Sequence, residues 1–174
     1  MDEEPGADVQ GPHSRLRDPA WQVCPRARWL WAIQGGLWAA VLVAGQVGWW
    51  FLDRRGPRDP HLVVALISGV LIVAYLVVMP RWRFRVHRWE VSATAVYTQS
   101  GWLSRERRIA PISRIQTVDL TRGPAAQALR LATVRVTTAS AAGPLVIEGL
   151  DQHDAVALVE SLTAVAAAER GDAT

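Results

Sequence analysis

Two long apolar stretches without charged residues restrict what this sequence can fold into. The first covers residues 29–52 and the second covers residues 62–79. As helices they would measure about 36 Å and about 27 Å, and the hydrocarbon core of a bilayer is about 30 Å thick. The connector between them is short and rich in turn-forming residues. We therefore expect a transmembrane hairpin over residues 29–79.

The arginines around the hairpin predict its orientation, because positively charged flanks stay on the cytoplasmic side. Two spans place both termini on one side of the membrane. The flanking arginines are Arg15, Arg17, Arg26, Arg28, Arg81, Arg83, Arg85 and Arg88, and the connector holds Arg54, Arg55 and Arg58. The count favours a multi-pass cell-membrane protein with cytoplasmic termini. Residues 1–28 begin with a polar run rich in Pro and Gly and are predicted to form a disordered cytoplasmic tail.

The first apolar stretch carries a stripe of small residues. This small-residue stripe consists of Gly36, Ala40, Ala44 and Gly48, which recur at every fourth position. On a helix these residues lie on one face and allow another helix to approach closely. The approaching helix is either the second helix of the same chain or a helix of a second copy.

The segment that follows the hairpin alternates between basic and apolar residues. Its basic positions from 81 to 87 are odd and its apolar positions are even, as in a half-buried strand. Trp89 and Val91 then shift the apolar residues to odd positions, which predicts a β-bulge near His87 and Arg88. We expect this strand to open a soluble domain over residues 80–169.

The rest of the domain has the signals of short strands and one final helix. The expected strands cover residues 96–99, 102–109, 115–120, 133–138 and 145–148, and the expected short helices cover residues 112–114 and 125–132. Asp151 is the predicted N-cap of a C-terminal amphipathic helix, and residues 170–174 are expected to fray. The predicted fold is membrane-anchored α+β, with a small bent antiparallel β-barrel capped by the C-terminal helix.

Several motifs of the domain resemble the bacterial pleckstrin-homology-like (PH-like) domain family, in particular its YdbS-type membrane proteins with two transmembrane helices. The motifs are RVHRWEV at 85–91, VYTQSGWL at 96–103, APISRIQTVD at 110–119, RGP at 122–124 and LATV at 131–134. The resemblance implies a seven-stranded, strongly bent sheet or barrel capped by a helix. It also implies a longer multi-domain relative as a partner in the membrane. Arg130 stands where many relatives have glycine.

The sequence predicts no catalytic residues, no metal site and no cofactor. Its four histidines are scattered, and its only cysteine, Cys24, excludes an intrachain disulfide and a thiolate metal cluster. His87 and Glu90 are the nearest approach to an acid–base pair, but no nucleophile accompanies them. We therefore expect that the protein is not an enzyme.

Arginines after the hairpin are the candidate binding residues, for lipid or for a partner. They are Arg81, Arg83, Arg85, Arg88, Arg105, Arg107 and Arg108. Either they hold anionic lipid headgroups, or they only fix the topology and place their charges at the interface.

The function predicted from the sequence is that of a non-enzymatic adaptor or accessory subunit of a membrane protein complex. The alternative is an anionic-lipid-binding module at the inner face of the cytoplasmic membrane. The expected partners are membrane lipids, a membrane protein and a second copy of the chain. Nucleic acid is not expected, because Trp82 and Phe84 of the predicted strand should point into the core.

Overall fold

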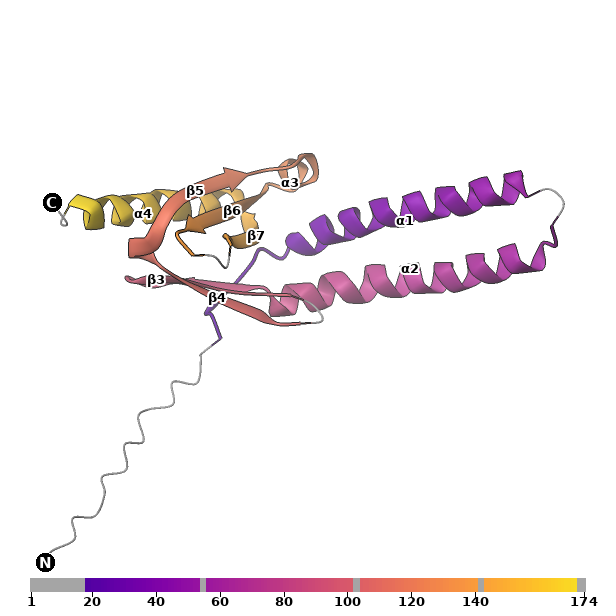
Figure 1. Cartoon of the computed structure of the whole chain (residues 1–174), viewed down its shortest axis with the longest axis horizontal. Coiled ribbons are helices and arrows are strands. Elements are labelled where there is room, and N and C mark those ends of the chain that lie inside the picture. Colours follow the sequence, from indigo (N-terminus) through magenta and orange to yellow (C-terminus); the bar gives the residue numbers. More distant parts are fainter. Residues whose placement is uncertain (1–17, 54–55, 102–103, 141–142, 172–174) are drawn as a thin grey trace, which may run out of the picture.

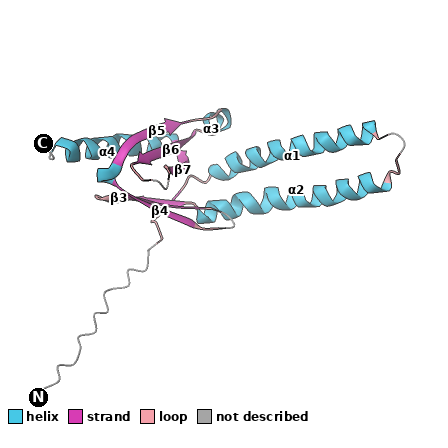
Figure 2. Cartoon of the chain, viewed as in Figure 1, coloured by secondary structure: helices cyan, strands magenta, loops and turns pink. Residues whose placement is uncertain are grey.

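Two long helices project from one end of a small β-rich domain (Figure 1). This computed structural model describes residues 18–53, 56–101, 104–140 and 143–171. Helix α1 covers Ala27–Leu52 and helix α2 covers Asp59–Val86. The two helices run antiparallel, and the strands are confined to the domain (Figure 2). Both helices are long and apolar enough to cross a membrane, by length and composition.

The contact between α1 and α2 uses small and polar residues of α1. Gly35 is buried, and a Cβ at this position would lie 2.9 Å from the Tyr75 ring of α2. Farther along, the Gln46 side-chain amide donates a hydrogen bond of 2.7 Å to the Ser68 hydroxyl. This pairing satisfies two polar groups within apolar helices.

The small-residue stripe does not make that contact. A Cβ at Gly36 or at Gly48 would have no heavy atom within 4 Å, and Ala40 and Ala44 are exposed. Packing of the stripe against the second helix of the same chain, one of the two expected uses, is therefore wrong. Contact with a second copy stays a prediction.

Helix α2 continues through Pro80, so the predicted strand over residues 81–87 is wrong. Proline costs a helix one hydrogen bond, but its φ angle suits the helical backbone. The Arg81 side chain donates a hydrogen bond of 2.7 Å to the Val77 carbonyl, and the His87 N–H closes the helix on the Arg83 carbonyl at 2.9 Å. The change of parity at His87 therefore marks the end of a helix and not a bulge. Trp82, expected in the core, is 46% exposed.

Within the described residues, seven strands form two antiparallel sheets, and the expected barrel is not closed. The first sheet has the order β1-β2-β3-β4 and contains Trp21–Gln22, Arg88–Val91, Ala95–Ser100 and Glu106–Pro111. The second sheet has the order β5-β6-β7 and contains Ile115–Thr121, Leu131–Thr138 and Leu145–Asp151. A short 3-10 turn, Ile112–Arg114, leads from one sheet to the other, as predicted for residues 112–114.

Strand β1 corrects the expectation of a disordered tail over residues 1–28. Residues 1–17 lie outside the described residues. Trp21 and Gln22, however, pair with Trp89 and Arg88 of β2, and Val23 is buried. The segment before the hairpin therefore belongs to the folded domain. A strand of two residues carries no periodicity by which the sequence could reveal it.

The C-terminal helix α4, Gln152–Gly171, packs against the core as the sequence predicts. Leu158 and Leu162 of α4 join core residues of both sheets. The Asp151 carboxylate accepts a hydrogen bond of 2.9 Å from the His153 N–H, which confirms the predicted N-cap. The helix includes Gly171, and residues 172–174 of the expected frayed tail lie outside the described residues.

The short helix α3, Pro124–Ala128, ends earlier than the predicted range of 125–132. Leu131 already begins strand β6. Between them, Arg130 has a φ of 54°, in the left-handed region that favours glycine. The residue with the left-handed backbone, just after the C-cap Leu129 of α3, is thus the one at which the family resemblance placed a glycine.

Candidate functional site

Four side chains meet where the hairpin joins the domain. This junction cluster consists of Trp31 from α1, Arg83 from α2, His87 after α2 and Glu148 from β7. The Arg83 guanidinium donates a hydrogen bond of 2.7 Å to the Glu148 carboxylate. The Trp31 indole nitrogen lies 3.5 Å from the same carboxylate oxygen. The Arg83 Cζ lies 4.7 Å from the Trp31 ring centroid, as in a cation–π contact.

His87 is buried at the inner edge of the cluster. Its ring centroid lies 4.9 Å from that of Trp31, and its Nδ1 is 2.9 Å from the Arg83 carbonyl oxygen. Because a carbonyl only accepts, Nδ1 carries the proton of the neutral ring. Burial, and then the positive charge of Arg83, lower the pKa of His87 below its ordinary value. The imidazole is therefore neutral at neutral pH.

A close backbone contact between α1 and β7 supports the cluster. Gly149 has a φ of 77°, and a Cβ there would lie 2.5 Å from the Cβ of Ala27. The Gly149 carbonyl accepts a hydrogen bond of 2.9 Å from the Cys24 N–H. Arg26 pairs with Asp151 and also donates to the Leu129 carbonyl at 3.1 Å. These contacts join the start of α1 to β7 and to Leu129 at the end of α3.

The predicted binding arginines do not form one free basic face. Arg83 is held in the junction cluster, and Arg88 donates a hydrogen bond of 3.5 Å to the Pro19 carbonyl. Arg107 pairs with Asp18 and donates to the Gln99 side chain at 3.0 Å. These arginines hold the N-terminal segment and the junction in place.

The remaining predicted arginines differ in their contacts. Arg108 pairs with Glu106 at 2.6 Å and donates to the Pro144 carbonyl at 3.1 Å. Arg81 is exposed and hydrogen-bonds only within α2. Arg85 and Arg105 are exposed and have no ion pair or side-chain hydrogen bond within the described residues. Of the seven predicted arginines, Arg81, Arg85 and Arg105 are those whose side chains remain open to a ligand within the described residues.

The junction cluster has the geometry of a structural joint. The suspected pair of His87 and Glu90 does not come together, because His87 packs on Trp31 while Glu90 accepts a hydrogen bond of 2.9 Å from the Ala20 N–H. In the part of the chain that the structure describes, no group of three or more His, Cys, Asp or Glu side chains could hold a metal ion. The cluster can therefore fix the angle between hairpin and domain.

Sequence reasoning missed Trp31, Glu148 and Gly149. Trp31 lies at the start of the first apolar stretch, where aromatic residues typically form an interfacial belt, but it is only 1% exposed. Glu148 interrupts the apolar run LVIEGL, and a single acid in a buried strand is a signal that a cation lies opposite. That signal could have indicated an ion pair, although not its partner.

Comparison with known proteins identifies the fold. The family described as "Bacterial PH domain" matches residues 34–166. The chain belongs to the bacterial PH domain family. This result confirms the resemblance drawn from the motifs. No solved structure matches the chain.

A relative of this bacterial PH protein supports the membrane assignment. The chain is 26% identical over 156 residues to a protein of Bacillus subtilis (strain 168) named UPF0699 transmembrane protein YdbS. The matched region covers 85% of this chain and 93% of the relative. This relative and the two apolar helices together indicate that the chain is a membrane protein with a PH-like domain.

Proposed function

We propose that this bacterial PH protein is a non-enzymatic accessory subunit of a membrane protein complex. Its PH-like domain acts as an adaptor on the cytoplasmic side, and both termini lie in the cytoplasm. The observation that carries the proposal is the junction cluster, in which Arg83 of the hairpin binds Glu148 of the domain at 2.7 Å. This contact supports a fixed presentation of the domain to a partner.

The short connection between the hairpin and the domain also supports a fixed presentation of the domain. Helix α2 ends at Val86 and strand β2 begins at Arg88, so a single residue separates the helix from the sheet. A domain that only needed to be tethered could hang on a flexible linker, which lets it explore many orientations. A partner that contacts the hairpin and the domain together needs one orientation, because ordering a mobile domain on binding would weaken the complex.

The proposed partner is a membrane protein that covers part of the hairpin. Trp38 of α1 is 76% exposed, and it lines a hollow along the hairpin together with Leu71 and Tyr75 of α2. Such side chains lie against lipid or against another helix. The small-residue stripe is the surface that a close helix–helix contact would use. A longer multi-domain relative or a second copy of the chain fits this description.

A crosslinking pull-down from native membranes tests the proposal. We would compare the unchanged chain with the variant Arg83→Gln, Glu148→Gln, which removes the ion pair of the junction. The matched control is Arg135→Gln, Glu160→Gln, since both of these side chains are exposed on the domain. We expect the junction variant to lose most of the captured partner and the control to keep it. Equal capture by both variants would contradict the proposal, as would no reproducible partner for the unchanged chain.

Anionic-lipid binding is the second candidate function. The observation that favours it is the exposure of Arg85 and Arg105, which have no partner among the described residues. Each arginine near an anionic surface contributes about 1 kcal/mol. Reconstituted protein should therefore enrich spin-labelled phosphatidylglycerol over phosphatidylcholine in its boundary lipid. Arg85→Gln, Arg105→Gln should reduce this selectivity, whereas Arg135→Gln should not; equal selectivity in all three proteins would exclude this function.

A further inference from the structure

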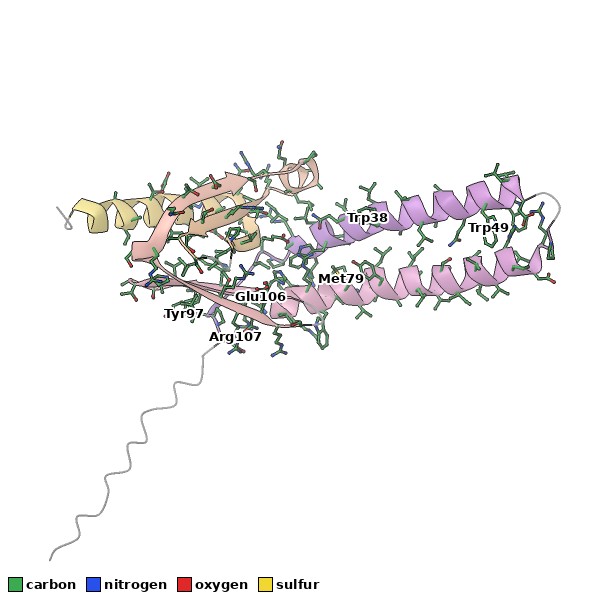
Figure 3. All side chains as sticks on the ribbon, viewed as in Figure 1. Trp38, Trp49, Met79, Tyr97, Glu106 and Arg107 are labelled. Carbon is green, nitrogen blue, oxygen red and sulfur yellow. The ribbon has the colours of Figure 1, made fainter. Side chains whose placement is uncertain are left out.

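A groove lies between the two helices at the end of the hairpin next to the domain. Met79, on α2, marks this end in Figure 3, and Trp49 marks the opposite end. The groove has a volume of about 200 Å³. Its lining residues are Arg28, Trp29, Ala32, Leu76, Pro80 and Arg81. Of the binding and packing residues predicted from the sequence, Arg81 lines this groove and the others do not.

Two arginines give the groove a basic rim. Arg28 and Arg81 are both exposed, and neither pairs with a carboxylate within the described residues. The Arg28 Nε donates to the Pro25 carbonyl at 3.1 Å, and an Arg81 terminal nitrogen donates to the Val77 carbonyl at 2.7 Å. A guanidinium has five N–H donors, so each side chain keeps four for a ligand. Two such forks on one groove are suited to the oxygens of a phosphate diester.

The wall of the groove is apolar apart from one acceptor. Trp29, Ala32 and Leu76 provide apolar surface, which suits an acyl chain. Pro80 has no N–H, so the Leu76 carbonyl four residues earlier lacks its usual donor from the helix. Leu76 and Pro80 both line the groove, so this carbonyl lies in a residue of the groove wall. It can accept a hydrogen bond from a ligand hydroxyl.

The position of the groove along the helices selects the kind of ligand. The uncharged stretch of α1 begins at Trp29, and that of α2 ends at Met79. Arg28 and Arg81 lie just outside these stretches. Where the hairpin crosses a membrane, this boundary lies at the level of the lipid headgroups. A basic rim above an apolar wall then faces lipids with a phosphate above an acyl chain.

We propose that this groove binds one anionic phospholipid, with its phosphate on Arg28 and Arg81 and an acyl chain along Leu76 and Ala32. A zwitterionic headgroup places its own cation near the two arginines and is bound less tightly. The proposal rests on the membrane insertion of the hairpin and deepens the lipid-binding candidate. It uses a groove distinct from the exposed Arg85 and Arg105.

Native mass spectrometry of the full chain in mild detergent tests the proposal. Phosphatidylglycerol and phosphatidylcholine are titrated as probes against the unchanged chain, Arg28→Gln, Arg81→Gln, and the double variant. The control is Arg122→Gln, Arg135→Gln, which removes the same charge from exposed positions on the domain. We expect one bound phosphatidylglycerol and a loss of affinity of about fivefold for each groove arginine replaced, with no loss in the control. An equal loss in the control, or equal binding of both lipids, would overturn the proposal.

Two further arms identify the occupant. Ala32→Leu fills the groove but keeps both arginines, so it should also lose phosphatidylglycerol; unchanged binding would show that surface charge alone attracts the lipid. Soluble glycerol phosphate should bind far more weakly than the lipid, and equal binding would make the ligand a free phosphate ester. Bound lipid is counted on the monomer peak of the mass spectrum, so these results do not depend on whether the chain joins a complex.

Discussion

Arg83 and Glu148, 65 residues apart in the sequence, join the membrane hairpin to the PH-like domain through a hydrogen-bonded ion pair of 2.7 Å. The Arg83 side chain is 23% exposed and the Glu148 side chain is 37% exposed. The pair is therefore better shielded from water than a surface ion pair, although it is not fully buried. Its contribution to the free energy of unfolding should lie between that of an exposed ion pair and that of a fully buried one.

Glu148→Gln should destabilise the junction. The amide keeps the shape of the side chain but removes the charge opposite Arg83, which stays half-buried. We expect the free energy of unfolding to fall by about 1–2 kcal/mol, measured by thermal or urea unfolding in detergent. The exposed Glu160 provides the control, since Glu160→Gln should change it by less than about 0.5 kcal/mol. Equal stability of the two variants would show that the pair does not hold the junction.

Gly149→Ala should separate α1 from β7. A Cβ at this position would lie 2.5 Å from the Ala27 Cβ, and the backbone φ of 77° is unfavourable for any residue with a Cβ. The left-handed conformation alone costs about 1–2 kcal/mol, so the total loss of unfolding free energy should exceed about 2 kcal/mol. Gly123→Ala is the control, because a Cβ at Gly123 has no atom within 4 Å. A loss in Gly149→Ala no larger than in Gly123→Ala would contradict the close contact.

The elements with strong local signals were predictable from the sequence. Pro111 marks the end of strand β4, and Asp151 caps helix α4, because both residues act on the backbone beside them. The segment 81–87 was misread because alternating arginine and apolar residues also fit a helix, in which arginine is favourable. What keeps it helical is a set of distant contacts, among them those of Arg83 with Glu148 and of His87 with Trp31.

The junction cluster could not be predicted for the same reason. Its members come from α1, the end of α2 and β7, which only the fold brings together. The seven arginines predicted to bind a ligand include one member of the junction cluster, Arg83. Local sequence patterns, however, do not distinguish an arginine that forms an ion pair within the chain from one that is free to bind a ligand. The groove arginine Arg28 was read only as a topology signal, because its neighbour Arg81 is 53 residues away in the sequence.

Arg130→Gly should stabilise the domain. Arg130 has a φ of 54° at the end of α3, and glycine reaches this region without a steric penalty from a Cβ. The gain is reduced by the greater freedom of glycine in the unfolded chain, so we expect about 1 kcal/mol in the free energy of unfolding. Arg130→Ala is the matched control, since it removes the same charge but keeps the Cβ. A gain of equal size in both variants would assign the effect to the charge of Arg130.

His87 should make the stability of the junction depend on pH. Burial, followed by the charge of Arg83, lowers the pKa of His87 in the folded chain, whereas a histidine in the unfolded chain has a pKa of about 6.5. Between these two values the unfolded chain binds more protons. The free energy of unfolding therefore decreases as the pH falls below about 6.5, and His87 adds no further decrease once the pH is below its folded pKa.

The variant His87→Gln removes this titration while keeping a neutral polar side chain. Unfolding measured from about pH 8 to about pH 5 should show a shallower decrease for His87→Gln than for the unchanged chain. His153 is exposed at the start of α4, so His153→Gln should keep the original slope. If the slope instead persists in His87→Gln, another group titrates on unfolding and the buried imidazole does not set the pH response of the junction.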